Sequence, residues 1–321
     1  MLRILLFTFL LLGAVYLILF YKSRKNISAN ESFGQKKDYG KETSSKVFHP
    51  EENTPYLLTV PHRPLIIAHR GGAALGPENT MQAFENAVEM GVDMLEVDVR
   101  MTADSQLITH HDATIDRMTD GRGLIADLCL AELEAYDFGH GFSEEERRTV
   151  RSSENGEKAG LTLLSDVMER FSEVSLTVEI KDEGAPGKKA VDRIIRLIER
   201  YNYRGKIIVG SFHDEVQNYV AENYSSSIPF SAARREVSKF FLLSRMRLGG
   251  LYTGLISALQ LPTKYYGCDL THPSIINAAH DMGISVHYWT VNDPEEMKRL
   301  IELNVDGIIT DRPDLLIEIV E

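Results

Sequence analysis

A repeated alternation between short apolar runs and longer amphipathic segments constrains the fold of this chain most. Strands buried on both faces read as short hydrophobic runs, and helices that join them imply a parallel sheet. The expected strands are residues 65–69, 94–99, 107–111, 176–181, 206–212, 228–234, 285–291 and 307–311, with 255–262 as a further candidate. The expected helices are residues 81–90, which Thr80 caps, and residues 188–201, 214–223, 273–282 and 294–303.

About eight such strand–helix units within residues 61–321 predict a (β/α)8 barrel of the TIM type. An open doubly wound sheet is disfavoured because no Gly-x-Gly-x-x-Gly fingerprint is present. Nine candidate strands compete for eight places, so one of them is expected to lie outside the barrel. Residues 113–165, with a highly charged central stretch, are expected to form an insertion or long loop.

The beginning of the chain is predicted to be a separate unit. Residues 4–21 carry no charge, are almost wholly apolar and are long enough to cross a bilayer. Basic residues follow without a small-x-small cleavage site, so we expect a transmembrane anchor over residues 1–25, with a cleaved signal peptide as the alternative. Residues 26–60 are polar and predict a flexible tether. Basic residues flank both ends of the apolar stretch, so the side of the membrane on which the domain lies stays open, with a weak bias toward the cytoplasm.

The charge of the chain argues against a nucleic-acid partner. Residues 1–60 carry eight lysines and arginines against five aspartates and glutamates, a net charge of +3. Since the whole chain has a net charge of −12, residues 61–321 carry −15. Phosphate contacts in nucleic acids need clustered cations, which such an acidic domain does not offer. The two cysteines, Cys129 and Cys268, are far apart and form no metal or redox motif.

Ionisable side chains gather at the carboxyl ends of the first four expected strands. The ends of barrel strands converge on one face, where active sites lie. In chain order these residues are His69 and Arg70, then Glu96 and Asp98, then His110, His111 and Asp112, and finally Glu179 and Lys181. A site at this face is therefore expected.

The carboxylates predict a metal ion. Glu96 and Asp98 are two positions apart, so on a strand their side chains share one face. Burying them with Glu179 is unfavourable unless a cation neutralises them. All-oxygen ligation suits one divalent cation, Mg²⁺ or Ca²⁺, with Glu96, Asp98 and Glu179 as ligands. The competing interpretation is that Glu96 and Asp98 pair with barrel arginines or lysines.

The remaining residues suit hydrolysis of a phosphodiester. His69 and His111 are placed to act as a general acid and a general base, in either order. Arg70 and Lys181 offer cations to a phosphate. Glu78, on the loop that follows Arg70, either steadies these groups or contacts the substrate.

At this point the chain resembles glycerophosphodiester phosphodiesterases. The resemblance covers residues 65–315 and rests on motifs in a fixed order: HRG-(x)5-PENT at 69–80, EVDV at 96–99, HDATIDRMTDGRG at 111–123, VEIK at 178–181, SF at 211–212, YWTVN at 288–292 and GIITDRP at 307–313. It implies a metal-dependent barrel enzyme that cleaves glycerophosphodiesters to glycerol 3-phosphate and an alcohol. It also implies catalytic roles for His69 and His111 and substrate contact for Trp289. His110 competes with His111, and we prefer His111 because it precedes Asp112.

Three other interpretations remain. Related barrels cleave lysophospholipids or sphingolipids in the manner of a phospholipase D, and an anchored enzyme lies close to such single-chain lipids. A catalytically silent, membrane-tethered binding barrel is disfavoured because it has no need of both acid/base and metal residues. A sugar-phosphate isomerase barrel gives no reason for two histidines beside three carboxylates. The oligomeric state is not predicted by any pattern in the sequence.

Overall fold

The computed structural model of the chain describes residues 62–142, 159–203 and 207–321. All of them belong to one compact unit, Val47–Glu321. The predicted anchor and tether, residues 1–60, lie outside the described residues, as does the charged centre of the predicted insertion. Within the three described ranges, no helix combines the length and the apolar character needed to cross a membrane.

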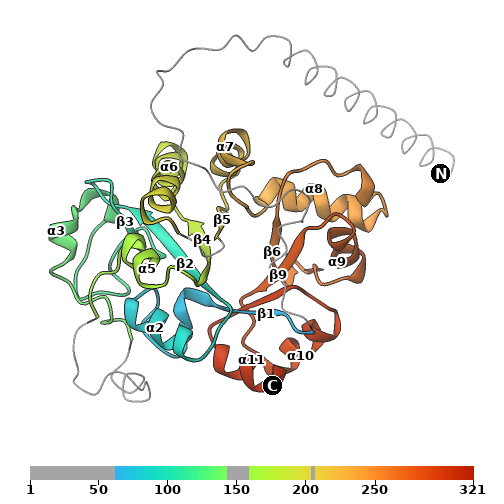
Figure 1. Cartoon of the computed structure of the whole chain (residues 1–321), viewed down its shortest axis with the longest axis horizontal. Helices are drawn as coiled ribbons and strands as arrows, with labels where there is room; N and C mark the ends of the chain where they lie inside the picture. The colour runs from blue at the N-terminus through green and yellow to red at the C-terminus, as the bar shows by residue number, and fades with distance from the viewer. Residues whose placement is uncertain (1–61, 143–158, 204–206) are drawn as a thin grey trace, which may run out of the picture. The chain divides into compact units, whose positions relative to one another are not determined.

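The described strands form the predicted barrel. The parallel strands are β1 (Leu65–Ala68), β2 (Met94–Met101), β4 (Ser175–Ile180), β5 (Ile207–Gly210), β6 (Ala258–Pro262), β9 (Ser285–Trp289) and β10 (Gly307–Thr310). They follow the order β5-β4-β2-β1-β10-β9-β6 around the sheet (Figure 1). Phe230 and Ser231 bridge Val209 of β5 and Ala258 of β6 in parallel, which supplies the eighth position and closes the ring.

Two of the candidate strands behave differently from the others. Residues 107–109 form β3 (Leu107–Thr109), which pairs antiparallel with the far end of β2 and lies outside the ring. Residues 258–262, within the further candidate, take a barrel position instead. The strand predicted at 228–234 is wrong in extent, because only two of its residues bridge the neighbouring strands and a helix begins at Arg234.

Helices cover the outside of the ring (Figure 1). The longer ones are α2 (Met81–Glu89), α5 (Leu164–Arg170), α6 (Gly184–Tyr201), α7 (Asp214–Tyr224), α8 (Arg234–Arg245), α9 (Pro273–His280), α10 (Pro294–Glu302) and α11 (Pro313–Val320). The five predicted helices are confirmed, while α5, α8 and α11 were not predicted. The Thr80 hydroxyl accepts a hydrogen bond from the Ala83 amide and caps α2 as expected.

Strand residues alternate between two apolar cores. Leu95, Val97 and Val99 of β2 pack in the large core between the sheet and the helices. Met94, on the opposite phase of β2, packs in a smaller core inside the ring with Ile67 and four other apolar side chains. Since alternate residues share a face, Glu96 and Asp98 follow Met94 along the inner face toward the carboxyl end of the strand. The inner core therefore forms the apolar floor beneath the polar site.

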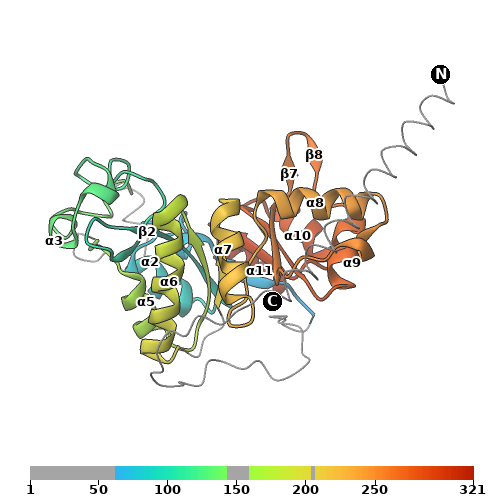
Figure 2. The same ribbon diagram turned by 90° about the horizontal axis from the view of Figure 1, so that it is seen from above.

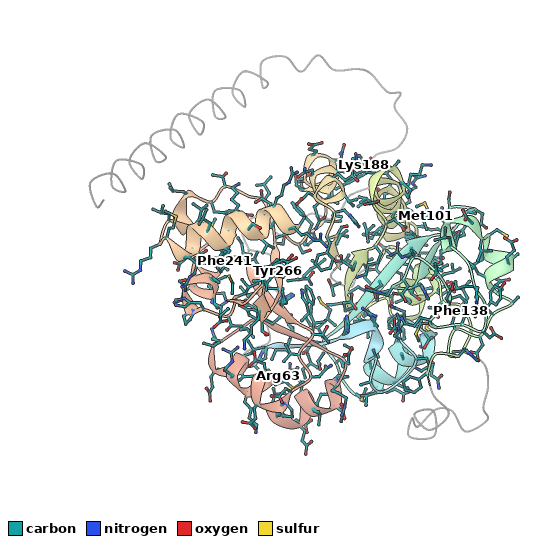
Figure 3. The ribbon with its side chains drawn as sticks, turned by 180° about the vertical axis from the view of Figure 1, so that it is seen from behind. Arg63, Met101, Phe138, Lys188, Phe241 and Tyr266 are labelled. Carbon is teal, nitrogen blue, oxygen red and sulfur yellow. The ribbon has the colours of Figure 1, made fainter. Side chains whose placement is uncertain are left out.

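Two segments outside the barrel ring follow the carboxyl ends of their preceding strands. The segment between β3 and α5 holds α3 (Leu130–Leu133) and has its own apolar core around Ile115, Ile125 and Phe138. Figure 3 labels Phe138 in this segment. After β6 the chain forms a small hairpin, β7 (Lys264–Tyr265) and β8 (Cys268–Asp269), which projects from the barrel (Figure 2). This hairpin was not predicted.

Candidate active site

A pocket opens at the carboxyl ends of the strands and contains most of the predicted site residues. It is lined by His69, Arg70, Glu96, His111, Thr177, Glu179, Lys181, Ser211, Phe212, Ser231, Ala232, Gln260, Trp289, Thr290 and Ile309. Seven of the nine predicted residues are therefore brought together. The two exceptions, Glu78 and Asp98, lie behind the pocket wall and contact residues that line it.

The turn after β1 delivers Arg70 to the site. Arg70 adopts a left-handed backbone conformation with φ of 53°, and Gly71 follows with φ of 84°. A Cβ at Gly71 would lie 2.9 Å from the Ala83 carbonyl carbon, so this position requires glycine on both counts. The turn aims the Arg70 amide at Glu96, whose Oε2 accepts a hydrogen bond of 2.9 Å. The glycines of the HRGG sequence thus serve the placement of Arg70.

Two pocket carboxylates have raised pKa values. Burial, together with the neighbouring Asp98, raises the pKa of Glu96 to about 7. Burial likewise raises the pKa of Glu179 to about 7, despite the Lys181 ammonium nearby. Among the described residues, Oε1 of Glu179 is buried without a hydrogen-bond partner. A Cβ at position 210 would lie 2.5 Å from Oε2 of Glu179, so Gly210 leaves the space that this carboxylate occupies.

Asp98 differs from the other two carboxylates. It is fully buried, and its oxygens lie 2.8 Å from Nζ of Lys181 and 3.0 Å from Nε of Arg70. Besides these two ion pairs, Asn79 donates a hydrogen bond of 3.0 Å to Oδ2 of Asp98. Although burial opposes ionisation, these two cations hold the pKa of Asp98 below its usual range. Asp98 therefore positions Arg70 and Lys181, as the competing interpretation of the sequence anticipated for this residue.

His69 is held from the last strand of the barrel. Its Nδ1–H donates a hydrogen bond of 2.6 Å to Asp311, and Asn292 donates one of 2.7 Å to the other oxygen of Asp311. Its Nε2 lies 4.0 Å from Oε2 of Glu96. Burial opposes the charged imidazolium, but Asp311 and Glu96 outweigh it and raise the pKa of His69. Nδ1 is thus occupied, and Nε2 is the ring atom available to a substrate.

His111 is held by its own neighbour. Its Nδ1–H donates to Asp112 at 2.8 Å, and Nε of Arg117 donates to the other Asp112 oxygen at 2.6 Å. Burial lowers the pKa of His111, and Arg117 and His111 together hold the pKa of Asp112 at about 2 against its burial. The side chain of the adjacent His110 does not line the pocket. Its Nε2–H donates to the Thr114 carbonyl, and its ring packs edge-on against Phe138.

Glu78 contacts two arginines and does not line the pocket. Its Oε1 accepts hydrogen bonds from Nη1 of Arg70 at 2.9 Å and from Nη2 of Arg117 at 2.7 Å. Its Oε2 accepts a third, from Nη1 of Arg117 at 2.9 Å. Despite its burial, these cations lower the pKa of Glu78. Of the two roles expected for Glu78, the geometry favours that of steadying Arg70.

The rest of the pocket lining is uncharged and combines aromatic and apolar side chains with polar ones, namely Thr177, Ser211, Ser231, Gln260 and Thr290. Phe212 and Trp289 meet edge-to-face with ring centroids 5.5 Å apart. The Lys181 ammonium lies 5.7 Å from the Phe212 ring centroid. Tyr288, the neighbour of Trp289, is instead fully buried and donates its hydroxyl to the Leu270 carbonyl. The pocket therefore joins a charged half to an uncharged half across Lys181 and Phe212.

The donor set fits a divalent cation in part. Within the residues that the structure describes, no three acidic, histidine or cysteine side chains stand at metal-binding separations. Glu96 and Glu179 nonetheless present two under-neutralised carboxylates to one cavity, with one orphaned oxygen. Hard oxygen donors of this kind suit Mg²⁺ or Ca²⁺. The charge of Asp98 is already met by Lys181 and Arg70, so Glu96 and Glu179 are the better candidates of the three.

Sequence reasoning missed three residues of the site. The sequence motifs contain Asp311, Asn292 and Arg117, but no role was predicted for them. Each of the three contacts a histidine or a carboxylate on a different segment of the chain. Asp311 could have been found from the hydrogen-bonding requirement of His69. A buried histidine at a strand end needs an acceptor for Nδ1–H, and unassigned aspartates in other motifs were the available candidates.

Comparison with known proteins places the chain in a family. The sequence model of the Glycerophosphoryl diester phosphodiesterase family matches residues 69–315. A glycerophosphodiester phosphodiesterase of Caldanaerobacter subterraneus is 32% identical over 268 residues, which cover 80% of this chain and 97% of the relative. The human lysophospholipase D GDPD1 is 28% identical over 281 residues, covering 78% and 84% of the two chains.

Solved structures show the same fold. A putative glycerophosphoryl diester phosphodiesterase of Silicibacter pomeroyi superposes with a TM-score of 0.66 at 22% identity, over 82% of this chain and 94% of that one. An Oleispira antarctica phosphodiesterase, solved in complex with the product sn-glycerol-3-phosphate, gives 0.65 at 19% identity, over 80% and 97%. Together with the family match, these similarities show that the chain belongs to the glycerophosphoryl diester phosphodiesterase family and is a phosphoric diester hydrolase.

Proposed function

We propose that this enzyme hydrolyses glycerophosphodiesters to glycerol 3-phosphate and an alcohol with the help of one divalent cation in the pocket. One observation carries the proposal: a single pocket is lined at once by two histidines, two carboxylates and two cations. A phosphodiester needs each of these. The cations receive its negative oxygens, and the histidines move the protons. An isomerase or a binding barrel has no use for all six together.

The side chains divide the work by position. Arg70 and Lys181 bind the phosphate oxygens, and Asp98 fixes both cations from behind. His69 and His111 each have Nδ1 engaged by an aspartate, so proton transfer occurs at Nε2 of each ring. One Nε2 accepts the proton of the nucleophile, which is water or the glycerol 2-hydroxyl. Attack by the 2-hydroxyl first gives a cyclic phosphate, which water then opens to glycerol 3-phosphate. The other Nε2 donates a proton to the leaving oxygen, so the departing alcohol leaves uncharged.

We propose that Glu96 and Glu179 hold the cation, with Asp98 as a third candidate ligand. The raised pKa values of Glu96 and Glu179 and the orphaned Glu179 oxygen support this assignment. When bound, Mg²⁺ or Ca²⁺ neutralises these carboxylates and polarises a phosphoryl oxygen. The removal of this charge also relieves the repulsion that Glu96 and Glu179 would exert on an anionic substrate.

A second substrate class, single-chain lysophospholipids, is favoured by the uncharged half of the pocket. Phe212, Trp289, Ala232 and Ile309 offer an apolar wall beside the phosphate cations. The name of the human relative, lysophospholipase D GDPD1, points to the same class. Trp289→Ala should lower kcat/KM for the lysophospholipid more than for glycerophosphocholine while leaving metal binding intact.

We also propose that residues 1–25 anchor the enzyme in a membrane through a single span. The support is the uncharged apolar run at residues 4–21 and the basic residues that follow it. A tether then holds the domain near lipid headgroups, where the local concentration of a lipid substrate is high.

Product analysis tests the substrate proposal. The full chain is incubated with glycerophosphocholine, lysophosphatidylcholine or sphingomyelin, each with a divalent cation and with EDTA. We expect choline and glycerol 3-phosphate from the first substrate, choline and a lysophosphatidate from the second, and neither reaction in EDTA. Full activity in EDTA would contradict the cation. Hydrolysis of sphingomyelin alone would contradict the substrate class.

A further inference from the structure

Arg117 makes contacts that no step of the proposed reaction uses. Its Nε donates to Asp112 at 2.6 Å, and its Nη1 and Nη2 donate to the two oxygens of Glu78 at 2.9 and 2.7 Å. The guanidinium therefore bridges two carboxylates on separate loops. A planar fork with donors on three nitrogens is the side chain that can hold both at once, which a lysine ammonium cannot reproduce.

The two carboxylates that Arg117 bridges each hold a pocket residue. Asp112 accepts the Nδ1–H of His111, and Glu78 accepts from Nη1 of Arg70. A continuous chain of hydrogen-bonded charges thus runs from His111 to Arg70 and passes through Arg117 at its centre. His111 and Arg70 come from different strand ends, and this chain of side-chain hydrogen bonds links them, in addition to their shared neighbour Asp98 on β2.

We propose that Arg117 is a positioning residue that fixes His111 relative to Arg70, and so places the proton-transfer atom against the bound phosphate. The inference rests on the proposed function, because its consequence for rate requires a phosphate on Arg70 and a proton moved by His111. Without the guanidinium, Asp112 keeps only His111 and Glu78 keeps only Arg70, so this chain no longer fixes the separation of the two pocket residues. Misplacement of a catalytic group by about 1 Å can cost about 10²-fold in rate.

A purely structural role for Arg117 is disfavoured by where it lies. Its side chain is 46% exposed, whereas the insertion folds around buried Ile115, Ile125 and Leu133. Ion pairs of half-exposed side chains contribute modestly to stability, and the more buried partner, Glu78, keeps its hydrogen bond to Arg70 when Arg117 is lost. The loss of Arg117 should therefore leave the fold intact and act on geometry. Because the side chain reaches the surface, its removal also leaves an opening into which a small cation can diffuse.

The test is chemical rescue of Arg117→Ala in the full chain. Arg117→Ala should lower kcat for glycerophosphocholine about 10²-fold, with the melting temperature close to wild type. Millimolar guanidinium, which replaces the lost group, should restore part of kcat, whereas sodium chloride at equal ionic strength should not. Arg117→Lys should stay impaired. Arg122→Ala, an exposed arginine of the same insertion, is the matched control and should retain wild-type kinetics.

Two results would overturn the inference. Arg117→Ala within twofold of wild type would show that the bridge is dispensable. A loss of kcat that follows a lowered melting temperature and is not rescued by guanidinium would show a role in folding only. If the wild-type chain hydrolyses no phosphodiester, the proposed function fails instead. The positioning role of Arg117 is then tested by nuclear magnetic resonance of the His111 imidazole. Its ¹⁵Nδ1 resonance should move in Arg117→Ala and stay in place in Arg122→Ala, and an unmoved resonance overturns it.

Discussion

The carboxylate of Asp311 lies 2.6 Å from Nδ1 of His69, although the two residues are 242 positions apart in the chain. Ring closure explains the contact. β1 and β10 are parallel neighbours, with Ala68 opposite Thr310, so the residues that follow the two strands meet at the rim. The barrel therefore places the acceptor of the His69 imidazole by joining the first strand to the last.

Asp311→Asn should lower kcat for glycerophosphocholine by about 10²-fold, because the imidazole loses a charged acceptor and its fixed orientation. KM should change little, since Asp311 does not line the pocket. Steady-state kinetics check this. Asp314→Asn is the matched control, because Asp314 lies close by in the first turn of α11 and pairs with Arg312, which does not line the pocket. Equal effects of the two substitutions would contradict the role of Asp311.

His111→Ala should lower kcat by about 10²–10⁴, the usual range for a lost general acid or base, without a large change in folding. His110→Ala should have a much smaller effect on kcat and should lower stability, because His110 packs against Phe138 within the insertion. Kinetics and thermal melting of both variants separate the two. An essential His110 beside a dispensable His111 would show that the assignment at this strand end is reversed.

His287 predicts a pH dependence of stability. It is fully buried inside the barrel, and burial lowers its pKa to about 4, whereas an unfolded histidine titrates near 6.5. Between these values the unfolded chain takes up a proton that the folded chain does not. The free energy of unfolding should therefore fall as the pH is lowered from about 6.5 to about 4, by about 3 kcal/mol from this residue.

His287→Leu removes this titrating group, so its unfolding free energy should decline less over the same pH range. Urea unfolding of both proteins at several pH values gives the difference, in which the carboxylates common to both cancel. Parallel pH curves for the two proteins would contradict the assignment of this dependence to His287.

Removal of residues 1–55 should yield a soluble enzyme with unchanged kcat for glycerophosphocholine, because the pocket residues lie within residues 69–309. Fractionation of cells that express the two forms, followed by assay of each fraction, checks this. A truncated enzyme that still sediments with membranes would reveal a second membrane-binding surface on the barrel.

The strand ends that carry the site could be predicted from the sequence. Charged residues that directly follow a buried barrel strand lie at the rim of the barrel, where the ends of neighbouring strands meet. His69, His111, Glu96 and Glu179 meet in the pocket for this reason. The surroundings of Asp98 could not be read from spacing alone. Two cations lie within 3.0 Å of it, and this pairing depends on side-chain directions across three elements.

The predicted fold differs from the structure where local sequence patterns were ambiguous. Residues 228–234 contain apolar side chains that suit a strand, but the chain needs only Phe230 and Ser231 to close the ring before α8 begins. The β7–β8 hairpin escaped prediction because each of its strands has only two residues. Arg117 was missed because its partners, Asp112 and Glu78, lie on two loops whose proximity no local pattern reveals.

In the proposed function, one pocket cleaves the phosphodiester with the help of a divalent cation. The release of glycerol 3-phosphate from glycerophosphocholine, measured while Mg²⁺ or Ca²⁺ is titrated into EDTA-treated enzyme, tests it most directly. The wild-type rate should rise from near zero to saturation, and Glu96→Gln and Glu179→Gln should stay near zero at cation concentrations that saturate the wild type, with their folds intact. A wild-type rate that does not depend on the cation, or variants that follow the wild-type titration, would contradict the claim.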